Sequence, residues 1–224
     1  MRHYVVRFTR RQRIEHFSVM TLFTLLVLTG LPQKFYEGGW AQAIILGLGG
    51  IDRVRWLHRA AGIGFTLFTA FHLTLVTGMV MLGRAPLSLV PTRRDFEDAI
   101  QQLNYYLGTT DTPARFGRFD YRQKFEYWGL VLGAVIVIST GLVLLFPIFV
   151  TQYLPGEIVP ASKLAHGNEG LMAFLVVIIW HIYNAHLSPD VFPFDKTIFT
   201  GKMSVERMHH EHPLELERIK EQGD

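Results

Sequence analysis

The sequence contains no cysteine among its 224 residues. This absence excludes disulfide bonds, iron–sulfur clusters held by thiolates and the Cys-x-x-Cys-His attachment of c-type haem. Any haem that this chain holds must therefore be bound without a covalent link, as haem b.

Long apolar stretches dominate the chain, which is 49% hydrophobic and has 17 phenylalanines. Four of them are long enough to cross a bilayer, at about residues 16–36, 57–82, 125–150 and 164–187. The first has full span length and no small-residue cleavage site after it, so we expect a retained helix rather than a signal peptide. We predict an all-α integral membrane protein, a four-transmembrane-helix bundle forming one domain over residues 1–224.

Basic residues are concentrated in three places: five in the N-terminal tail, seven between the second and third spans, and five in the C-terminal tail. The other two connections share the remaining five. By the positive-inside rule, both termini and the central loop are expected to be cytoplasmic, which requires an even number of spans. The basic patches are better explained as topology signals than as nucleic-acid sites, so we expect no nucleic-acid partner.

Three other segments carry weaker signals. Residues 41–51 are apolar but too short to span, and we expect them to lie on the membrane surface. The long cytoplasmic loop, residues 83–124, contains an expected amphipathic helix, also on that surface, with apolar residues at Phe96, Ile100, Leu103 and Leu107. In the tail, residues 188–224, three histidines suggest a metal tract, but we prefer a solvated tail that contacts a partner subunit.

Four histidines lie in two of the predicted spans. His58 and His72 are 14 residues apart, and His166 and His181 are 15 apart. On a helix these gaps are roughly four turns, so the members of each pair lie near one face and about 21 Å apart along the axis. Spans two and four both run inward, so His58 and His166 share the outer level and His72 and His181 the inner level. Two facing helices of this kind can hold two bis-histidine haems.

A fifth histidine leaves the inner pair open. His16 lies at the cytoplasmic start of the first span, level with His72 and His181. The spacing favours His72 with His181, but His16 could replace His72, ligate a third haem, or stand beside the haem as a proton donor to a quinone.

Other side chains near these histidines could contact a haem. Gly62 and Gly170 each follow a histidine by four residues and would clear space for a macrocycle on the same helix face; close helix packing explains a single glycine equally well. Arg59 and Arg55 are at the outer level and could pair with haem propionates, or could snorkel to the interface. Glu169, three residues past His166, could relay protons.

Four segments together resemble the cytochrome b (gamma) subunit of respiratory formate dehydrogenase and related four-helix di-haem cytochromes, including those that accompany multihaem c cytochromes. They read RIEHFSVMTLFTLLVLTGLP, VRWLHRAAGIG, FDYRQKFEYWGLV and LAHGNEGLMAFLVVIIWHIY. The resemblance implies that His58 and His166 hold the outer haem, and that His16 and His181 hold the inner one. His72 departs from that pattern, and the 14- and 15-residue spacings resemble those of the cytochrome b of bc complexes.

The same resemblance implies a menaquinone site beside the inner haem, near the start of the third span. The residues that it implicates are Asp120, Tyr121, Gln123 and Lys124.

We therefore expect a di-haem b-type cytochrome, the quinone-reactive electron-transfer subunit of a larger oxidoreductase complex in a bacterial or archaeal cytoplasmic membrane. It would link menaquinone or ubiquinone to a periplasmic redox subunit, either a multihaem c cytochrome or an iron–sulfur protein. An alternative is a haem-free membrane anchor or transition-metal transporter, which is disfavoured because the spans lack a central Asp/Glu cluster. A ferric or ascorbate-type reductase without a quinone would share the fold.

Overall fold

The computed structural model describes residues 3–189 and 191–221, most of which are helical. They divide into two compact units. The spanning unit consists of Ile14–Gly78 and Leu130–Phe194. The terminal unit consists of Met79–Gly129 together with the two ends of the chain, up to Arg13 and from Asp195 onward. We describe each unit by itself.

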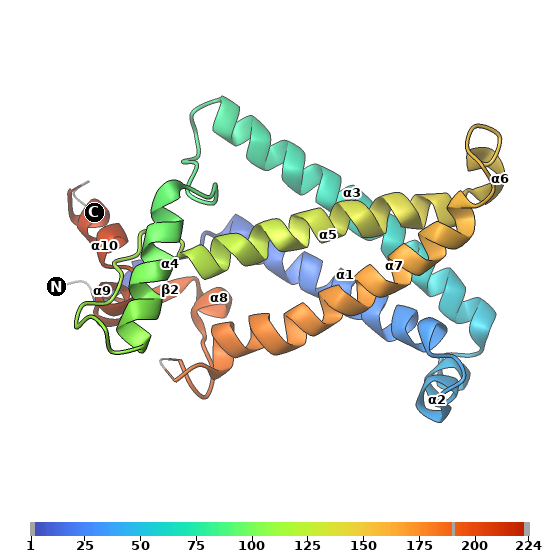
Figure 1. Ribbon diagram of the computed structural model, residues 1–224, viewed down its shortest axis with the longest axis horizontal. Coiled ribbons are helices and arrows are strands. Elements are labelled where there is room, and N and C mark those ends of the chain that lie inside the picture. The colour runs from blue at the N-terminus through green and yellow to red at the C-terminus, as the bar shows by residue number, and fades with distance from the viewer. Residues whose placement is uncertain (1–2, 190, 222–224) are drawn as a thin grey trace. The chain divides into compact units, whose positions relative to one another are not determined.

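Four helices are long and apolar enough to cross a membrane. They are α1 (Arg10–Lys34), α3 (Ile51–Met81), α5 (Tyr121–Leu145) and α7 (Ile158–Leu175), which continues as the π-helical turns η1 (Val176–His181) and η2 (Tyr183–Leu187) (Figure 1). They are 25 to 31 residues long, which exceeds the roughly 20 residues that a bilayer requires. At most 11% of each apolar window is buried inside the protein, as expected for helices whose neighbours are lipid chains. The predicted four-span helical architecture is confirmed.

Each spanning helix begins four to six residues before its predicted span, and the third also ends earlier than predicted. The third span was expected to reach residue 150, but α5 ends at Leu145 and a separate turn, α6, covers Pro147–Val150. Proline lacks the backbone N–H that would continue the helix, and its ring restricts the preceding residue, Phe146. The apolar segment after the first span forms a short helix, α2 (Gly39–Gly47).

The terminal unit joins the two ends of the chain in a small sheet. Strand β1 (Tyr4–Val6) pairs antiparallel with β2 (Lys202–Ser204), with Val5 opposite Met203. Helices α8 (Thr197–Thr200), α9 (Val205–Glu211) and α10 (Pro213–Glu221) flank β2 in the chain. Met203, Met208 and Leu216 form the buried core, against which Val5 and Val205 pack. Paired ends must lie on one side of a membrane, which agrees with an even number of spans.

The amphipathic helix of the long loop is present as α4 (Arg93–Tyr106). It begins at a capping box, in which the Asp95 carboxylate accepts a hydrogen bond from the backbone N–H of Thr92 (2.6 Å). Its apolar residues are exposed along one side: Phe96, Ile100, Leu103 and, just beyond the helix, Leu107. Contact of this side with lipid stays a prediction.

His212 connects three segments of the terminal unit. The residue is only 3% exposed, so the expectation of a solvated tail is wrong at this position. Nδ1 donates to the Gly117 carbonyl (2.8 Å), and Nε2 accepts from the guanidinium of Arg7 (3.2 Å). Burial and the charge of Arg7 lower the pKa of His212 from 6.5 to about 4. The neutral imidazole is therefore the form that holds the N-terminal segment, the loop and the tail together.

This arrangement predicts a pH-dependent stability. The unfolded chain binds a proton at His212 as the pH falls below about 6.5, whereas the folded chain resists it until about pH 4. The contribution of His212 to the free energy of unfolding is therefore complete above pH 6.5. It is lost as the pH falls toward 4, by roughly 3 kcal/mol in total. Thermal unfolding of the full chain in detergent, followed by circular dichroism across this range, measures it. His212→Ala should remove this part of the pH dependence, whereas His210→Ala, at an exposed position, should keep it. An equal pH dependence in both variants contradicts the assignment.

Candidate functional site

The spanning unit brings His58 of α3 and His166 of α7 together. Their ring centres are 6.1 Å apart and the ring planes are nearly perpendicular, at 86°. Two imidazoles that share one metal ion have ring centres about 6 Å apart, because each metal–nitrogen bond is about 2 Å and each ring nitrogen is about 1 Å from its ring centre. The separation therefore fits two axial ligands of one iron.

Helix α1 contacts the His58 ring at its Nδ1 atom. Nδ1 of His58 lies 2.9 Å from Oγ1 of Thr29. The Thr29 hydroxyl donates its own hydrogen to the Leu25 carbonyl (2.6 Å), so its oxygen accepts the hydrogen on Nδ1. The Leu26 carbonyl also accepts from His58. At Gly30, a Cβ atom would lie 3.0 Å from Cε1 of His58, so glycine permits this close approach.

Helix α5 holds the His166 ring in the same way. Nδ1 of His166 lies 3.0 Å from the Val137 carbonyl and 3.2 Å from Oγ1 of Thr140. Thr140 donates its hydrogen to the Ile136 carbonyl (2.6 Å), as Thr29 does to Leu25. A Cβ atom at Gly141 would lie 3.1 Å from Cε1 of His166.

These contacts determine which nitrogen can bind a metal. Acceptors surround Nδ1 of both rings, so Nδ1 carries the hydrogen and Nε2 keeps its lone pair. A metal-bound histidine commonly donates its other N–H to a carbonyl or a similar group, which fixes the ring and its tautomer. This support was not predicted from the sequence, although a Thr-Gly-Leu triplet occurs in both the first and the third span, at residues 29–31 and 140–142.

Removing the threonine hydroxyl should weaken metal binding without removing a ligand. We expect Thr29→Val to reduce haem affinity at the outer pair by about 10- to 100-fold, the usual cost of losing such a support. Haem transfer to a competing apoprotein measures this change. Thr21→Val is the control, because Thr21 in the same helix donates to its own Phe17 carbonyl (2.9 Å). Equal haem loss from both variants contradicts the proposed role.

A second histidine pair lies elsewhere in the spanning unit. His16 of α1 and His181, the last residue of η1, have ring centres 6.1 Å apart and planes inclined by 33°. This separation equals that of the first pair and again fits a shared iron. The structure thus brings His16 to His181, which the resemblance implies and the 14- and 15-residue spacings do not.

His72 has a different set of contacts. Its Nδ1 lies 2.8 Å from the Glu15 carboxylate, and its ring stacks on Phe68 at 6.5 Å. The preference for His72 over His16 as the partner of His181 assumed a regular α-helix. The π-helical turns over residues 176–187 contain more residues per turn and change the direction in which His181 points.

The other residues expected at the outer level lie as follows. Apart from the chain neighbours and the backbone of its own helix, the nearest described atom to a Cβ at Gly62 is Cδ2 of Leu26, at 4.0 Å, and none comes within 4 Å of a Cβ at Gly170. The helix faces at both glycines therefore have room beside them. Arg59 is exposed, and the exposed Arg55 lies 3.8 Å from Asp52.

The residues implicated in quinone binding lie in the terminal unit, where they begin α5. Asp120 and Gln123 cap the helix reciprocally: Oδ1 of Asp120 accepts from the Gln123 N–H (2.8 Å), and Oε1 of Gln123 accepts from the Asp120 N–H (3.2 Å). Arg122 donates to the other oxygen of Asp120 (2.7 Å).

The other two implicated residues contact the rest of the same unit. Lys124 donates to both oxygens of Asp95 in α4 (2.7 and 2.9 Å), and each of these side chains is 12% exposed. The Tyr121 ring packs against Phe116 at 6.0 Å. The sequence did not indicate that Lys124 also connects α5 to α4.

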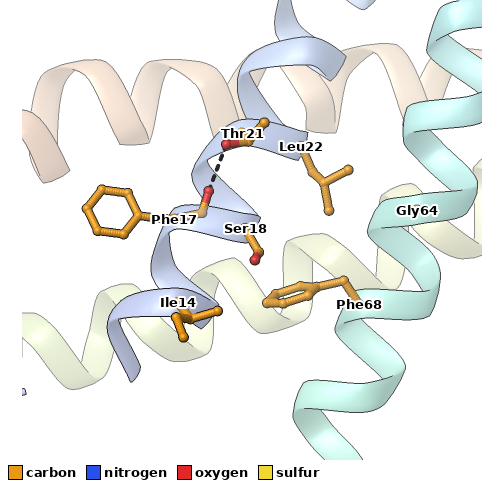
Figure 2. A pocket seen from close by; sticks show the side chains of 7 residues that line it. All are labelled: Ile14, Phe17, Ser18, Thr21, Leu22, Gly64 and Phe68. Atoms are coloured by element: carbon orange, nitrogen blue, oxygen red, sulfur yellow. Dashed lines mark hydrogen bonds between the residues drawn. The ribbon is translucent and has the colours of Figure 1, made fainter. Parts of the chain in front are cut away.

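An open surface pocket of about 630 Å³ lies between α1 and α3 (Figure 2). Its seven lining residues are Ile14, Phe17, Ser18, Thr21, Leu22, Gly64 and Phe68. The lining is mostly hydrocarbon and contains no titratable side chain. The pocket therefore offers van der Waals contact to an apolar chain rather than ligands to a metal.

Comparison with known proteins agrees with this geometry. Residues 7–191 match the family model described as prokaryotic cytochrome b561. The chain is 25% identical to the cytochrome b556(Fdn) subunit of nitrate-inducible formate dehydrogenase from Escherichia coli (strain K12), over 93% of this chain and 88% of the relative. It is 26% identical to the cytochrome b556(fdo) subunit of formate dehydrogenase from the same strain, over 81% of this chain and 78% of that protein. A formate dehydrogenase cytochrome b556 subunit from Haemophilus influenzae is 24% identical, over 81% and 70%.

The family match covers all four spans and the five candidate ligand histidines within them. Together with the four apolar helices, it makes this protein a multi-pass membrane protein of the bacterial inner membrane that binds haem b and transfers electrons as a subunit of an oxidoreductase. The chain belongs to the prokaryotic cytochrome b561 family.

Proposed function

We propose that this chain binds two haem b groups, one between His58 and His166 and one between His16 and His181, and carries electrons between a periplasmic redox partner and the quinone pool. The observation that supports this most strongly is the equal ring separation of 6.1 Å in both pairs. A single histidine in a span is expected to find a hydrogen-bond partner, but two pairs at metal-sharing distance favour two ligand sets.

The side chains have distinct tasks in this proposal. The four histidines each present one nitrogen to an iron, and Thr29 and Thr140 hold the outer rings in the tautomer that can bind. A bis-histidine haem b, when bound, accepts and releases one electron without a change of ligands. His166 and His181 are 15 residues apart, which is about 22 Å of helix, so the two pairs together extend across most of a hydrocarbon core of about 30 Å.

We propose a quinone site at the start of α5, formed by Asp120, Tyr121, Gln123 and Lys124. The largely buried ion pair of Lys124 with Asp95 supports it, since an ammonium group at the start of α5 is a suitable proton donor for a quinone oxygen. Menaquinone and ubiquinone both suit this chemistry.

For the periplasmic electron partner we propose a class of protein rather than one named protein. The relatives' names place them in formate dehydrogenases, but a periplasmic iron–sulfur protein or a multihaem c cytochrome would serve equally as the electron partner of this chain. A histidine-based metal transporter is a weaker explanation, because it would require one transport path, whereas the histidines form two separate facing pairs.

Quinol-driven haem reduction tests this function. We expect the purified full chain in lipid vesicles to be reduced by a menaquinol analogue, seen as a b-type α band, and Lys124→Ala to slow that reduction at least tenfold. Dithionite should reduce both proteins equally. Reduction by dithionite but by no quinol contradicts the quinone assignment.

A further inference from the structure

Glu169 is an ionisable side chain inside the fourth span. It lies three residues after His166 on α7, so both side chains are near one face of the helix. Acidic residues in spans are rare and mark functional positions, because an ionised carboxylate is costly in hydrocarbon.

A gap in the neighbouring helix accommodates this carboxyl group. Gly133 is the buried residue of α5, and a Cβ atom there would lie 2.6 Å from Oε1 of Glu169. A larger residue at this position would therefore require the Glu169 carboxylate to shift. One turn earlier on α5, no described residue lies within 4 Å of a Cβ at Gly129. The Glu169 side chain therefore points toward α5 at Gly133 rather than out to lipid.

We propose that Glu169 sets the redox potential of the outer haem site. This inference rests on the proposed two-haem function. Negative charge on this carboxyl group, one helical turn from His166, would stabilise an oxidised iron and so lower the potential of the outer site relative to the inner one. Electrons that enter from outside would then move inward toward the quinone side with a favourable free energy.

The charge of Lys34, near Glu169, would also affect the potential of the outer haem site. Lys34 of α1 donates to Oδ1 of Asn168 (2.8 Å), next to Glu169 in the sequence, and its positive charge opposes that of the carboxylate. His58 and His166 are neutral as ligands. A unit charge about 10 Å from an iron, at an effective dielectric constant near 20, changes the reduction equilibrium by roughly tenfold.

A redox titration of the purified full chain, followed by its α bands, tests the proposal. We expect Glu169→Gln to raise the reduced-to-oxidised ratio of one haem at least tenfold at fixed potential, or 59 mV for one electron, and to change the other less than twofold. Glu169→Asp should restore most of the original potential. Glu157→Gln is the matched control, since Glu157 is an exposed acid at the start of the same helix.

A second pair of variants tests the position of the carboxyl group without removing it. Gly133→Ala should displace it and shift the same haem, whereas Gly129→Ala should shift neither. If Glu169→Gln and Gly133→Ala both leave two haems at their original potentials, the role of Glu169 is overturned and the two-haem function stands. If the unmodified chain shows only one haem, the proposed function itself fails.

Discussion

Replacing His58 with alanine is expected to halve the haem content, from two per chain to one. In the proposed assignment, His58 would supply one of the two nitrogens that hold the outer haem, and a haem without a covalent link depends on both. His166 would remain with its Val137 and Thr140 contacts intact, so the protein should keep its helices. Haem per chain in the purified protein, from a pyridine haemochrome spectrum, gives the result directly.

The remaining haem should be the inner one, with an unchanged potential. His166→Ala should give the same spectrum and the same haem content, because both variants empty the same site. Different residual haems in the two variants, or two haems retained in either, contradict the pairing of His58 with His166.

Replacing His16 with alanine is expected to remove the inner haem, whereas His72→Ala should retain both. The ring of His16 lies 6.1 Å from that of His181, while His72 is bound through Nδ1 to Glu15. The variants are well matched, because each removes one histidine from the same level of the bundle. Haem content and the two midpoint potentials distinguish the outcomes.

The converse result would be equally clear. Loss of the inner haem in His72→Ala, with two haems kept in His16→Ala, would support the pairing of His72 with His181 that the 14- and 15-residue spacings favour. Three haems in the unmodified chain would make both His16 and His72 ligands.

The parts of this protein that the sequence predicts well are local. Four spans follow from apolar length alone, and the helix of the long loop follows from a Thr cap at residue 92 and an apolar stripe. The outer pair follows from topology, because His58 and His166 each begin a span that runs in the same direction. These properties depend on neighbours in the chain and on the thickness of a bilayer.

The parts that it does not predict depend on contacts between distant segments or on irregular backbone. The π-helical turns before and after His181 alter its direction, so a fixed angle per residue does not predict that the His16 ring lies 6.1 Å from the His181 ring. The pairing of β1 with β2 joins residues about 200 positions apart, which no short-range pattern encodes. The Thr-Gly-Leu triplets are visible in the sequence. That each threonine contacts a histidine of another helix becomes clear only from the structure.

The haem content of the purified full chain tests the central claim most directly. We predict two haem b per chain by pyridine haemochrome, with a b-type α band that resolves into two components in a redox titration. A folded preparation with no haem, or with one haem retained equally by His58→Ala and His16→Ala, would contradict a chain that holds two bis-histidine sites.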